Sequence, residues 1–318
     1  MNRILALIFS LSIAGVVSAQ QLDSTLLNPT RNPDYYNTLL SNVPLPHHDQ
    51  NWNAVEETFG RKGVTQGDVF KISFPRSDLK VKLGSVMIEP GLALTAWLAF
   101  RPMGNETMMM GDLVLLENEI APAMGKLLEN GLDVSAIHNH IVGESPKVMY
   151  MHVGGHGDAE KLAAAMKIVL QQTKTPLGPV SAKTKSTAEI DWGNVESILG
   201  HQGKHSGKLL QFGIPRVETL RDDDMEIPPF MGMATGINMQ MEGKKAATTG
   251  DFVLLVDEVS PVMHALIENG IAVTALHNHM LRETPRLFFM HFWGYDEPEK
   301  LARGLRAALD KINSAKAK

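Results

Sequence analysis

One stretch of 22 residues occurs twice in this chain, and the second copy aligns with the first without a gap. Residues 131–152 read GLDVSAIHNHIVGESPKVMYMH, and residues 270–291 read GIAVTALHNHMLRETPRLFFMH. The polar residues that fall into register are His138 with His277, His140 with His279, Glu144 with Glu283 and His152 with His291. Histidine and carboxylate side chains bind metal ions and transfer protons. We therefore expect the function of the protein at this repeated stretch.

The duplication extends to the N-terminal side of the histidines. The segment WNAVEETFGRKGVTQGDVFKISFPR, which starts at residue 52, matches WGNVESILGHQGKHSGKLLQFGIPR, which starts at residue 192. Each copy opens with a short amphipathic helix that should end at Gly60 or Gly200, because glycine readily adopts the left-handed cap conformation. Strands follow, then a second helix with Pro122 or Pro261 in its first turn.

The histidine stretch and a last helix complete each copy. Strands joined by tight hairpins and interleaved with helices predict an α+β fold. We expect two tandem repeats, each a mostly antiparallel sheet with helices on one face, similar to a split βαββα unit.

The N-terminus has the layout of a secretory signal peptide. Arg3 precedes an apolar run, and small residues end at Ala19 before Gln20. No later stretch reaches the roughly 18 apolar residues of a membrane span, so we expect no transmembrane segment after cleavage and a secreted or periplasmic protein. The expected segments are a signal peptide at 1–19, an extended N-terminal arm at 20–51, repeat domain 1 at 52–170, a linker at 171–190 and repeat domain 2 at 191–318.

Composition narrows the chemistry. The chain has no cysteine, so disulfides, thiolate zinc sites and a catalytic thiol are excluded. Its formal charge of −5 gives no basic excess for binding phosphates, so nucleic acid is not an expected partner. Any metal must be held by imidazole, carboxylate, thioether or backbone oxygen. The expected ligand is a small molecule or a component of the cell envelope.

The spacing of the histidines is suited to a metal ion. On a strand, residues two apart face the same side, so His138 and His140 can converge on one ion, as can His277 and His279. The third histidine, His152 or His291, returns on the neighbouring strand about 4.8 Å away, and the register decides which way it faces. We expect Glu144 and Glu283 to act as a fourth ligand or as the catalytic base. Three imidazoles and a carboxylate suit zinc, manganese, iron or copper.

The sequence also leaves room for other functions and for structural roles of other charged residues. Histidines on strands are commonly structural, so a non-catalytic binding module of the envelope is the alternative to a metal site. Copper handling is a further alternative, since the chain has 18 methionines. Arg76 and Arg216 follow prolines at matching places. They could clamp an anion, but we expect them in exposed salt bridges. Asp112 and Asp251 recur after glycine and are expected to serve a turn.

The second copy also carries a family resemblance. At VTALHNHMLRETPRLFFMHFWG, with GDFVLLVDEVSPVMHALIENG before it and EPEKLARGLRAALD after it, the chain resembles the LppY/LpqO family of bacterial secreted proteins and lipoproteins, a domain of unknown function. The resemblance covers nearly all of residues 52–310. The resemblance implies a duplicated protein of the cell envelope. Because the family has no established activity, the resemblance assigns none to this chain. The chain lacks the lipid-accepting cysteine of the lipoprotein members.

These observations favour an extracytoplasmic metal-binding protein. One set of ligands is expected in each repeat, with the glutamate as ligand or general base. If the protein is an enzyme, we expect a metal-dependent hydrolase, because a bound metal lowers the pKa of its water to about 7.

Overall fold

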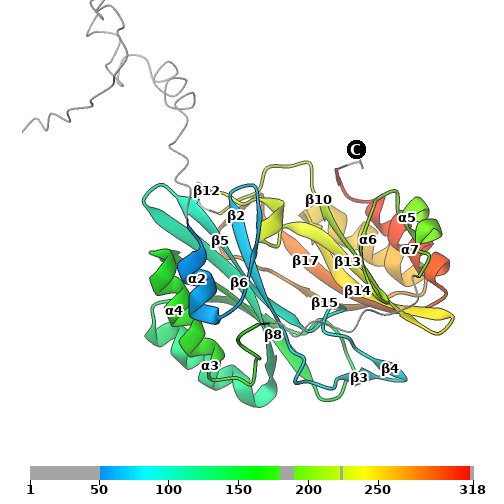
Figure 1. Cartoon of the computed structure of the whole chain (residues 1–318). Coiled ribbons are helices and arrows are strands. Elements are labelled where there is room, and N and C mark those ends of the chain that lie inside the picture. Colours follow the sequence, from blue (N-terminus) through cyan, green and yellow to red (C-terminus); the bar gives the residue numbers. More distant parts are fainter. Residues whose placement is uncertain (1–50, 180–189, 223–224, 316–318) are drawn as a thin grey trace, which may run out of the picture. The chain divides into compact units, whose positions relative to one another are not determined.

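Two six-stranded antiparallel sheets, one from each repeat, form the framework of the protein (Figure 1). The computed structural model describes residues 51–179, 190–222 and 225–315, all of which belong to one compact unit. The predicted signal peptide, the predicted arm up to residue 50 and residues 180–189 of the predicted linker lie outside the described residues. Among the helices described, none has the length and apolar character needed to cross a membrane.

The first repeat builds its sheet in the strand order β1-β2-β5-β6-β8-β7, with helices on one face (Figure 1). A small separate hairpin, β3–β4, follows β2. The elements in chain order are α2 (Asn53–Phe59), β1 (Val64–Gln66), β2 (Val69–Pro75), β3 (Lys82–Leu83), β4 (Val86–Met87), β5 (Thr95–Met103), β6 (Glu106–Leu116), α3 (Glu117–Glu129), β7 (Asp133–His138), β8 (Val148–Gly157) and α4 (Ala159–Leu170).

The second repeat has the equivalent sheet, in the order β15-β17-β14-β13-β10-β9. A three-stranded sheet, β12-β11-β16, lies beside its histidine loop. Its elements are α5 (Gly193–Leu199), β9 (Lys204–Ser206), β10 (Leu209–Pro215), β11 (Arg221–Asp222), β12 (Met225–Glu226), the 3-10 turn η1 (Pro229–Met231), β13 (Ala234–Glu242), β14 (Lys245–Leu254), α6 (Val256–Glu268), β15 (Ala272–His277), β16 (Glu283–Thr284), β17 (Phe288–Asp296) and α7 (Pro298–Leu309). The predicted α+β class and tandem organisation are confirmed.

A hydrophobic core lies between the helices and the sheet in each repeat. In the first repeat, Phe59 of α2 packs edge-to-face on Phe74 of β2, with ring centroids 5.0 Å apart. The short helix ends as expected, because Gly60 has a φ of 62° and Gly200 has a φ of 70°. In that conformation a residue with a Cβ would be strained.

The second helix of each repeat begins earlier than its proline suggests. α3 starts at Glu117 and α6 at Val256, which places Pro122 and Pro261 inside the helices. The start is fixed by a glutamate in the first turn, since Glu119 accepts a hydrogen bond from the backbone N–H of Leu116 at 2.9 Å. The glutamate carboxylate thus satisfies a backbone N–H at the start of the helix, and the proline lies beyond the first turn.

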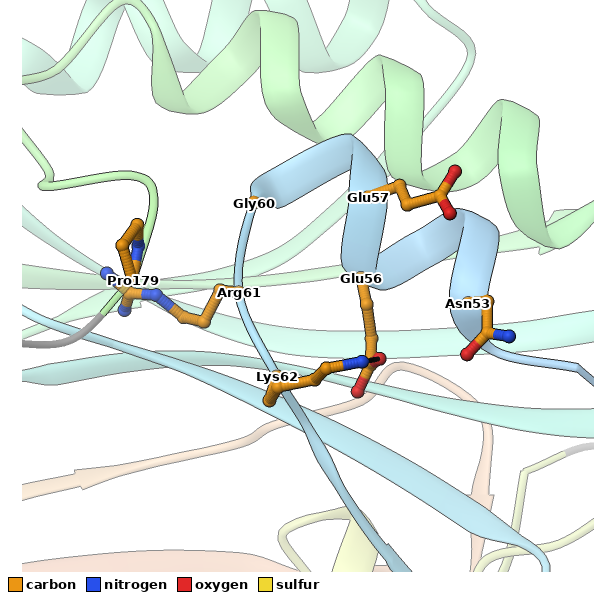
Figure 2. A pocket seen from close by; sticks show the side chains of 7 residues that line it. All are labelled: Asn53, Glu56, Glu57, Gly60, Arg61, Lys62 and Pro179. Carbon is orange, nitrogen blue, oxygen red and sulfur yellow. Dashed lines mark hydrogen bonds and ion pairs between the residues drawn. The ribbon is translucent and has the colours of Figure 1, made fainter.

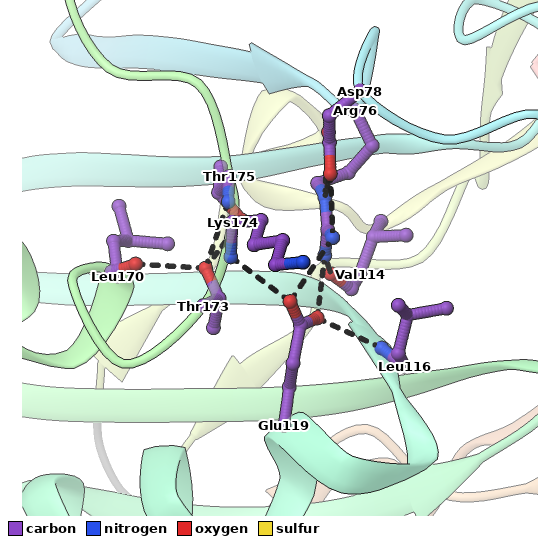
Figure 3. Close-up of polar contacts among 9 residues, drawn as sticks. All are labelled: Arg76, Asp78, Val114, Leu116, Glu119, Leu170, Thr173, Lys174 and Thr175. Carbon is purple, nitrogen blue, oxygen red and sulfur yellow. Dashed lines mark hydrogen bonds and ion pairs between the residues drawn. The ribbon is translucent and has the colours of Figure 1, made fainter.

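The same glutamate belongs to a buried ion pair (Figure 3). Arg76, fully buried at the end of β2, donates to Glu119 at 2.8 Å and to the carbonyl oxygen of Val114 at 2.5 Å. Glu119 also accepts from the backbone N–H of Lys174 at 2.9 Å, so residues just beyond α4 are held to the first repeat. Figure 3 shows how the two side chains connect four segments of the chain.

The second repeat has the equivalent pair. Arg216 donates to Glu258 at 2.6 Å and to the carbonyl oxygen of Val253 at 2.8 Å. The expectation that Arg76 and Arg216 form exposed salt bridges is therefore wrong. Each arginine lies inside its repeat, because it must satisfy the carbonyl oxygen at a strand end and a buried carboxylate together.

The face of each sheet opposite its helices meets the other repeat. Side chains from β13 reach β4 and the segment that follows it. Gln240 donates to the carbonyl oxygen of Met87 in β4 at 2.7 Å, and Asn238 donates to that of Leu92 at 3.1 Å. In return, Lys71 of β2 donates to the carbonyl oxygen of Phe230 in η1 at 3.4 Å. These contacts place the two inner sheet faces on either side of a common space.

Candidate functional site: a histidine centre shared by both repeats

The two histidine stretches meet, and their six imidazoles pack together. Each ring of the first repeat lies against a ring of the second. The centroid distances are 3.6 Å for His138–His277, 3.9 Å for His140–His291 and 3.7 Å for His152–His279. The structure therefore forms one shared centre where the sequence suggested a separate site in each repeat.

Reciprocal hydrogen bonds hold the two stretches against each other. Asn139, between the first two histidines, donates to the carbonyl oxygen of Thr274 at 3.0 Å, and its equivalent Asn278 donates to that of Ser135 at 3.3 Å. The hydroxyl of Ser135 donates to the carbonyl oxygen of His279. The hydroxyl of Thr274 donates in the same way to the carbonyl oxygen of the equivalent histidine in the first repeat. The asparagine of the H-N-H sequence thus fixes the contact between the repeats.

Two aspartates join the histidines from the neighbouring strands. In the antiparallel ladder Asp112 of β6 lies opposite His152 of β8, and Asp251 of β14 lies opposite His291 of β17. Residues opposite each other in a ladder point to the same face, so each aspartate faces the space between the sheets. The register that the sequence left open therefore directs His152 and His291 into the centre.

The expectation that Asp112 and Asp251 serve a turn is wrong, because both lie within long strands. The preceding glycines are needed for close packing between strands. A Cβ at Gly250 would lie 2.0 Å from the carbonyl oxygen of Gly236, and one at Gly111 would lie 2.7 Å from that of Trp97. A charged residue inside an apolar strand, repeated in register with the histidines, was the sequence signal for a functional role.

Ligand-type atoms from these side chains lie close enough to share a metal ion. Three groups have their nitrogen or carboxylate atoms within 4.8 Å of one another: Asp251, His277, His279 and His291; His138, His140 and His291; and His138, His152 and His277. The first group lies wholly in the second repeat, and the other two combine both repeats. Asp112 Oδ2 lies 3.6 Å from His140 Nε2, and Asp251 Oδ2 lies 3.2 Å from His279 Nε2.

The centre leaves many buried polar atoms without a hydrogen-bond partner. In the described part of the chain, eleven buried side-chain nitrogen and oxygen atoms have no partner, and nine of them belong to the six histidines, Asp112 and Asp251. Buried polar groups are nearly always paired in native proteins, and an unpaired one costs about 1–3 kcal/mol. Such a concentration of unpaired groups in one place indicates a site built for a ligand.

The environment keeps the histidines neutral. Burial lowers the pKa of His138, His140, His152 and His279, and the neighbouring imidazoles lower it further. Burial also lowers the pKa of His291 to about 4, although Asp251 acts in the opposite direction. Neutral imidazole has a free lone pair, which is the form that coordinates a metal.

Two hydrogen bonds fix which nitrogen carries the proton. His291 Nδ1 lies 2.8 Å from the carbonyl oxygen of Gly250, and His277 Nδ1 lies 2.9 Å from that of Asn278. A carbonyl oxygen only accepts, so Nδ1 must donate in both rings. The unpaired Nε2 atoms then offer their lone pairs to the centre, which is the usual arrangement for a metal-bound histidine.

The two glutamates of the repeated stretch have a different setting. Glu144 accepts a hydrogen bond from the backbone N–H of Val148 at 3.2 Å. Glu283 accepts one from Leu287 at 3.1 Å and pairs with Arg286 at 3.2 Å. Neither glutamate belongs to the groups of ligand atoms found among the described residues. Their contacts hold the loop between the histidine strands, and their catalytic role stays a prediction.

A chamber of about 430 Å³ opens onto the centre from between the two sheets. One end is formed by the two aspartates and by histidines of both repeats. The remaining wall residues include Lys71 and Trp97 from the first repeat, and Gln211, Asn238 and Thr249 from the second. This volume suits a small molecule.

A second hollow, of about 680 Å³, lies on the surface beside α2 (Figure 2). Three of its charged side chains have partners: Lys62 pairs with Glu56 at 2.5 Å, and Arg61 donates to the carbonyl oxygens of Pro176 and Gly178. The fourth, Glu57, is exposed. Figure 2 shows Lys62 directed toward Glu56, and Arg61 directed toward Pro179. None of the ligand groups found among the described residues lies in this hollow, so the chamber beside the histidines is the candidate functional site.

Comparison with solved structures gives only remote likenesses. A trimeric bacterial microcompartment shell protein, PduB, covers 79% of this chain and 93% of its own, with 10% identity and a TM-score of 0.22. EtuB from Clostridium kluyveri covers 79% of this chain and 89% of its own, with 10% identity and a TM-score of 0.18. With scores this low, neither likeness bears on fold or function. No curated protein matches the chain.

A family match covers most of the chain. The family described as "Domain of Unknown Function (DUF1259)" matches residues 53–172 and again residues 193–311. The two matches correspond to the two repeats, and each contains one aspartate and three histidines of the shared centre. The chain therefore belongs to the DUF1259 family, as a tandem pair of its domains.

Proposed function

We propose that the protein binds at least one divalent transition metal ion in the shared centre and uses it to hydrolyse a small molecule. The observation that carries this proposal is the convergence of eight ligand-type side chains whose nine buried atoms lack hydrogen-bond partners. One or more metal ions held by the three groups of ligand atoms would satisfy most of these atoms. Imidazole nitrogen with carboxylate oxygen, and no thiolate, suits zinc, manganese, iron or copper.

The residues have distinct roles in this proposal. Asp251, His277, His279 and His291 form the most complete group of ligands, and the first repeat's histidines extend it. A bound ion would supply Lewis acidity and activate a water molecule. Asp112, whose Oδ1 atom is unpaired and which lies beside His140, is placed to accept a proton from substrate or water. It is better placed for this role than Glu144 or Glu283.

Metal content is the direct test. The full chain is stripped with a chelator, reloaded separately with Zn²⁺, Mn²⁺, Fe²⁺ or Cu²⁺, and measured by elemental mass spectrometry after dialysis. We expect at least one equivalent of one metal to remain. The reloaded protein should then cleave nitrophenyl esters or phosphates, and the stripped protein should not. A folded protein that retains no metal would leave a non-catalytic binding module with structural histidines.

Copper handling is a second candidate, favoured by one observation. A cavity of about 140 Å³ adjoins His152 and His279 and is lined by several methionines. Three of them, Met108, Met109 and Met110, belong to β6, and the others are Met231, Met233 and Met280. Thioether sulfur binds Cu(I) and is a poor ligand for zinc or manganese. Selective Cu(I) retention that falls in a Met231→Leu/Met233→Leu variant would support this function over hydrolysis.

We also propose that the protein acts outside the cytoplasm and that its repeats are those of the LppY/LpqO family. The proposal rests on the signal-type sequence that ends at Ala19 and on the quoted stretch around the second set of histidines. N-terminal sequencing of the protein recovered from the envelope or the medium should read from Gln20. An intact N-terminus at Met1 in the cytoplasmic fraction would contradict it.

A further inference from the structure

The histidine centre is nearly symmetric, but the chamber beside it is not. Lys71 of β2 corresponds to Gln211 of β10, and Trp97 of β5 corresponds to Gly236 of β13. Thr249 lies where the first repeat has a methionine. The first repeat therefore contributes a cation and an aromatic wall, and the second contributes neutral polar groups.

Lys71 is held in place by an aromatic ring and a backbone carbonyl. Its ammonium lies 3.7 Å from the centre of the Trp97 ring and donates to the carbonyl oxygen of Phe230 at 3.4 Å. Among the described residues no ion pair within 4.0 Å is formed by this lysine. Burial lowers its pKa to about 8, and attraction from Asp112 opposes that shift. A lysine in this position is still mostly charged at neutral pH and has hydrogen-bond donors to spare.

The second repeat contributes a hydroxyl group to the same chamber. Thr249 is 2% exposed, and its hydroxyl oxygen has no hydrogen-bond partner. It lines the same chamber as Lys71 and precedes the Gly250-Asp251 pair on β14. A hydroxyl buried without a partner costs free energy unless a ligand or water meets it. The chamber thus presents an ammonium with hydrogen-bond donors to spare and a hydroxyl without a partner beside the histidine centre.

We propose that the chamber binds a small organic anion, with its carboxylate or phosphate oxygens on Lys71 and Thr249 and its reacting bond turned toward the histidine centre. The proposal deepens the proposed function and rests on it for the reaction, because it names the substrate class of the same site. A single lysine fits one anionic group. The Trp97 ring gives the organic part of the molecule an apolar surface to pack on.

The variant Lys71→Gln tests the assignment, because glutamine is the residue at the equivalent position of the second repeat. Lys161→Gln on α4 is the matched control, since that lysine is exposed on a helix. Benzoate and phenyl phosphate are the anionic probes, and benzamide is the neutral one. Binding is followed by calorimetry, in both the chelator-treated and the metal-loaded full chain.

We expect the wild type and Lys161→Gln to bind one of the two anions at least about tenfold more tightly than Lys71→Gln does, in the metal-free protein as well. Benzamide should not discriminate among the three. The tighter anion identifies a carboxylate or a phosphate ester as the group recognised. The metal-free experiment does not depend on a metal. A protein that loads no metal but shows this difference in anion affinity would therefore contradict the proposed hydrolase and support the anion site.

Equal affinity of Lys71→Gln and the wild type for both anions would overturn the anion site, whatever the metal result. A measurement without any variant guards against misfolding. The NMR signal of the Lys71 ammonium in the wild type should shift when benzoate or phenyl phosphate is added. An unchanged signal at saturating anion would also contradict the proposal.

Discussion

Replacing the first two histidines of either repeat should remove metal from the whole protein. The variants are His138→Ala/His140→Ala and His277→Ala/His279→Ala. Losing His277 and His279 removes two members of the ligand group that lies wholly in the second repeat. Losing His138 and His140 removes the rings that pack against His277 and His291 of that group, so we expect the group to lose the geometry that a metal needs. We expect retained metal, measured by elemental mass spectrometry after dialysis, to fall at least about tenfold in both variants, since each lost ligand weakens binding strongly.

His264→Ala is the control for these variants, because His264 is exposed on α6, outside the centre. It should retain as much metal as the wild type. Two independent sites would behave differently, with each double variant keeping half of the metal. That half-retention would refute the shared centre, and circular dichroism of each variant would show whether the fold is intact.

Replacing Arg76 by methionine should destabilise the protein by about 3–5 kcal/mol, the usual cost of leaving a buried charge without its partner. Burial acts to raise the pKa of Glu119, but Arg76 and the N–H groups of Leu116 and Lys174 hold it below its ordinary value. Without the guanidinium, the carboxylate and the carbonyl oxygen of Val114 lose their donor. Urea unfolding at neutral pH measures the loss.

A second substitution separates the free-energy cost of an unpaired buried charge from the cost of lost packing. Arg76→Met/Glu119→Gln should recover part of the stability, because the amide carries no charge to bury. Lys300→Met removes an exposed pair with Asp296 and should leave the unfolding midpoint unchanged. A loss in Arg76→Met below about 1 kcal/mol would mean that the pair behaves like a surface salt bridge.

The fold could be predicted from local signals that the sequence carries twice. The helix ends at Gly60 and Gly200 could be predicted, because glycine adopts a positive φ without strain. The helix starts predicted from Pro122 and Pro261 were wrong, because the capping glutamates at 119 and 258 decide where those helices begin. Local patterns predicted the elements, and side-chain hydrogen bonds set several of their boundaries.

The site was predicted only in part. Equal spacing identified the six histidines, but contact between the repeats is a property of the folded chain, so one centre was read as two. Asp112 was taken for a turn residue because Gly-Asp is common in turns, whereas here a neighbouring strand passes close to the glycine. Lys71 gave no signal at all. A lysine in an alternating strand is predicted to be exposed, whereas here Trp97 and the η1 turn of the second repeat lie against its ammonium.

The reciprocal bonds of Asn139 and Asn278 make the contact between the repeats isologous, as in a two-fold symmetric homodimer, since the same atoms act on both sides. A protein with one such domain would have to pair with an identical copy to assemble six histidines, and both halves of its chamber would then be identical. Fusion into one chain removes that restriction. One half can change residue by residue while the other does not. A lysine in one half of the chamber and a glutamine at the equivalent position of the other half is a difference that no symmetric pair can have.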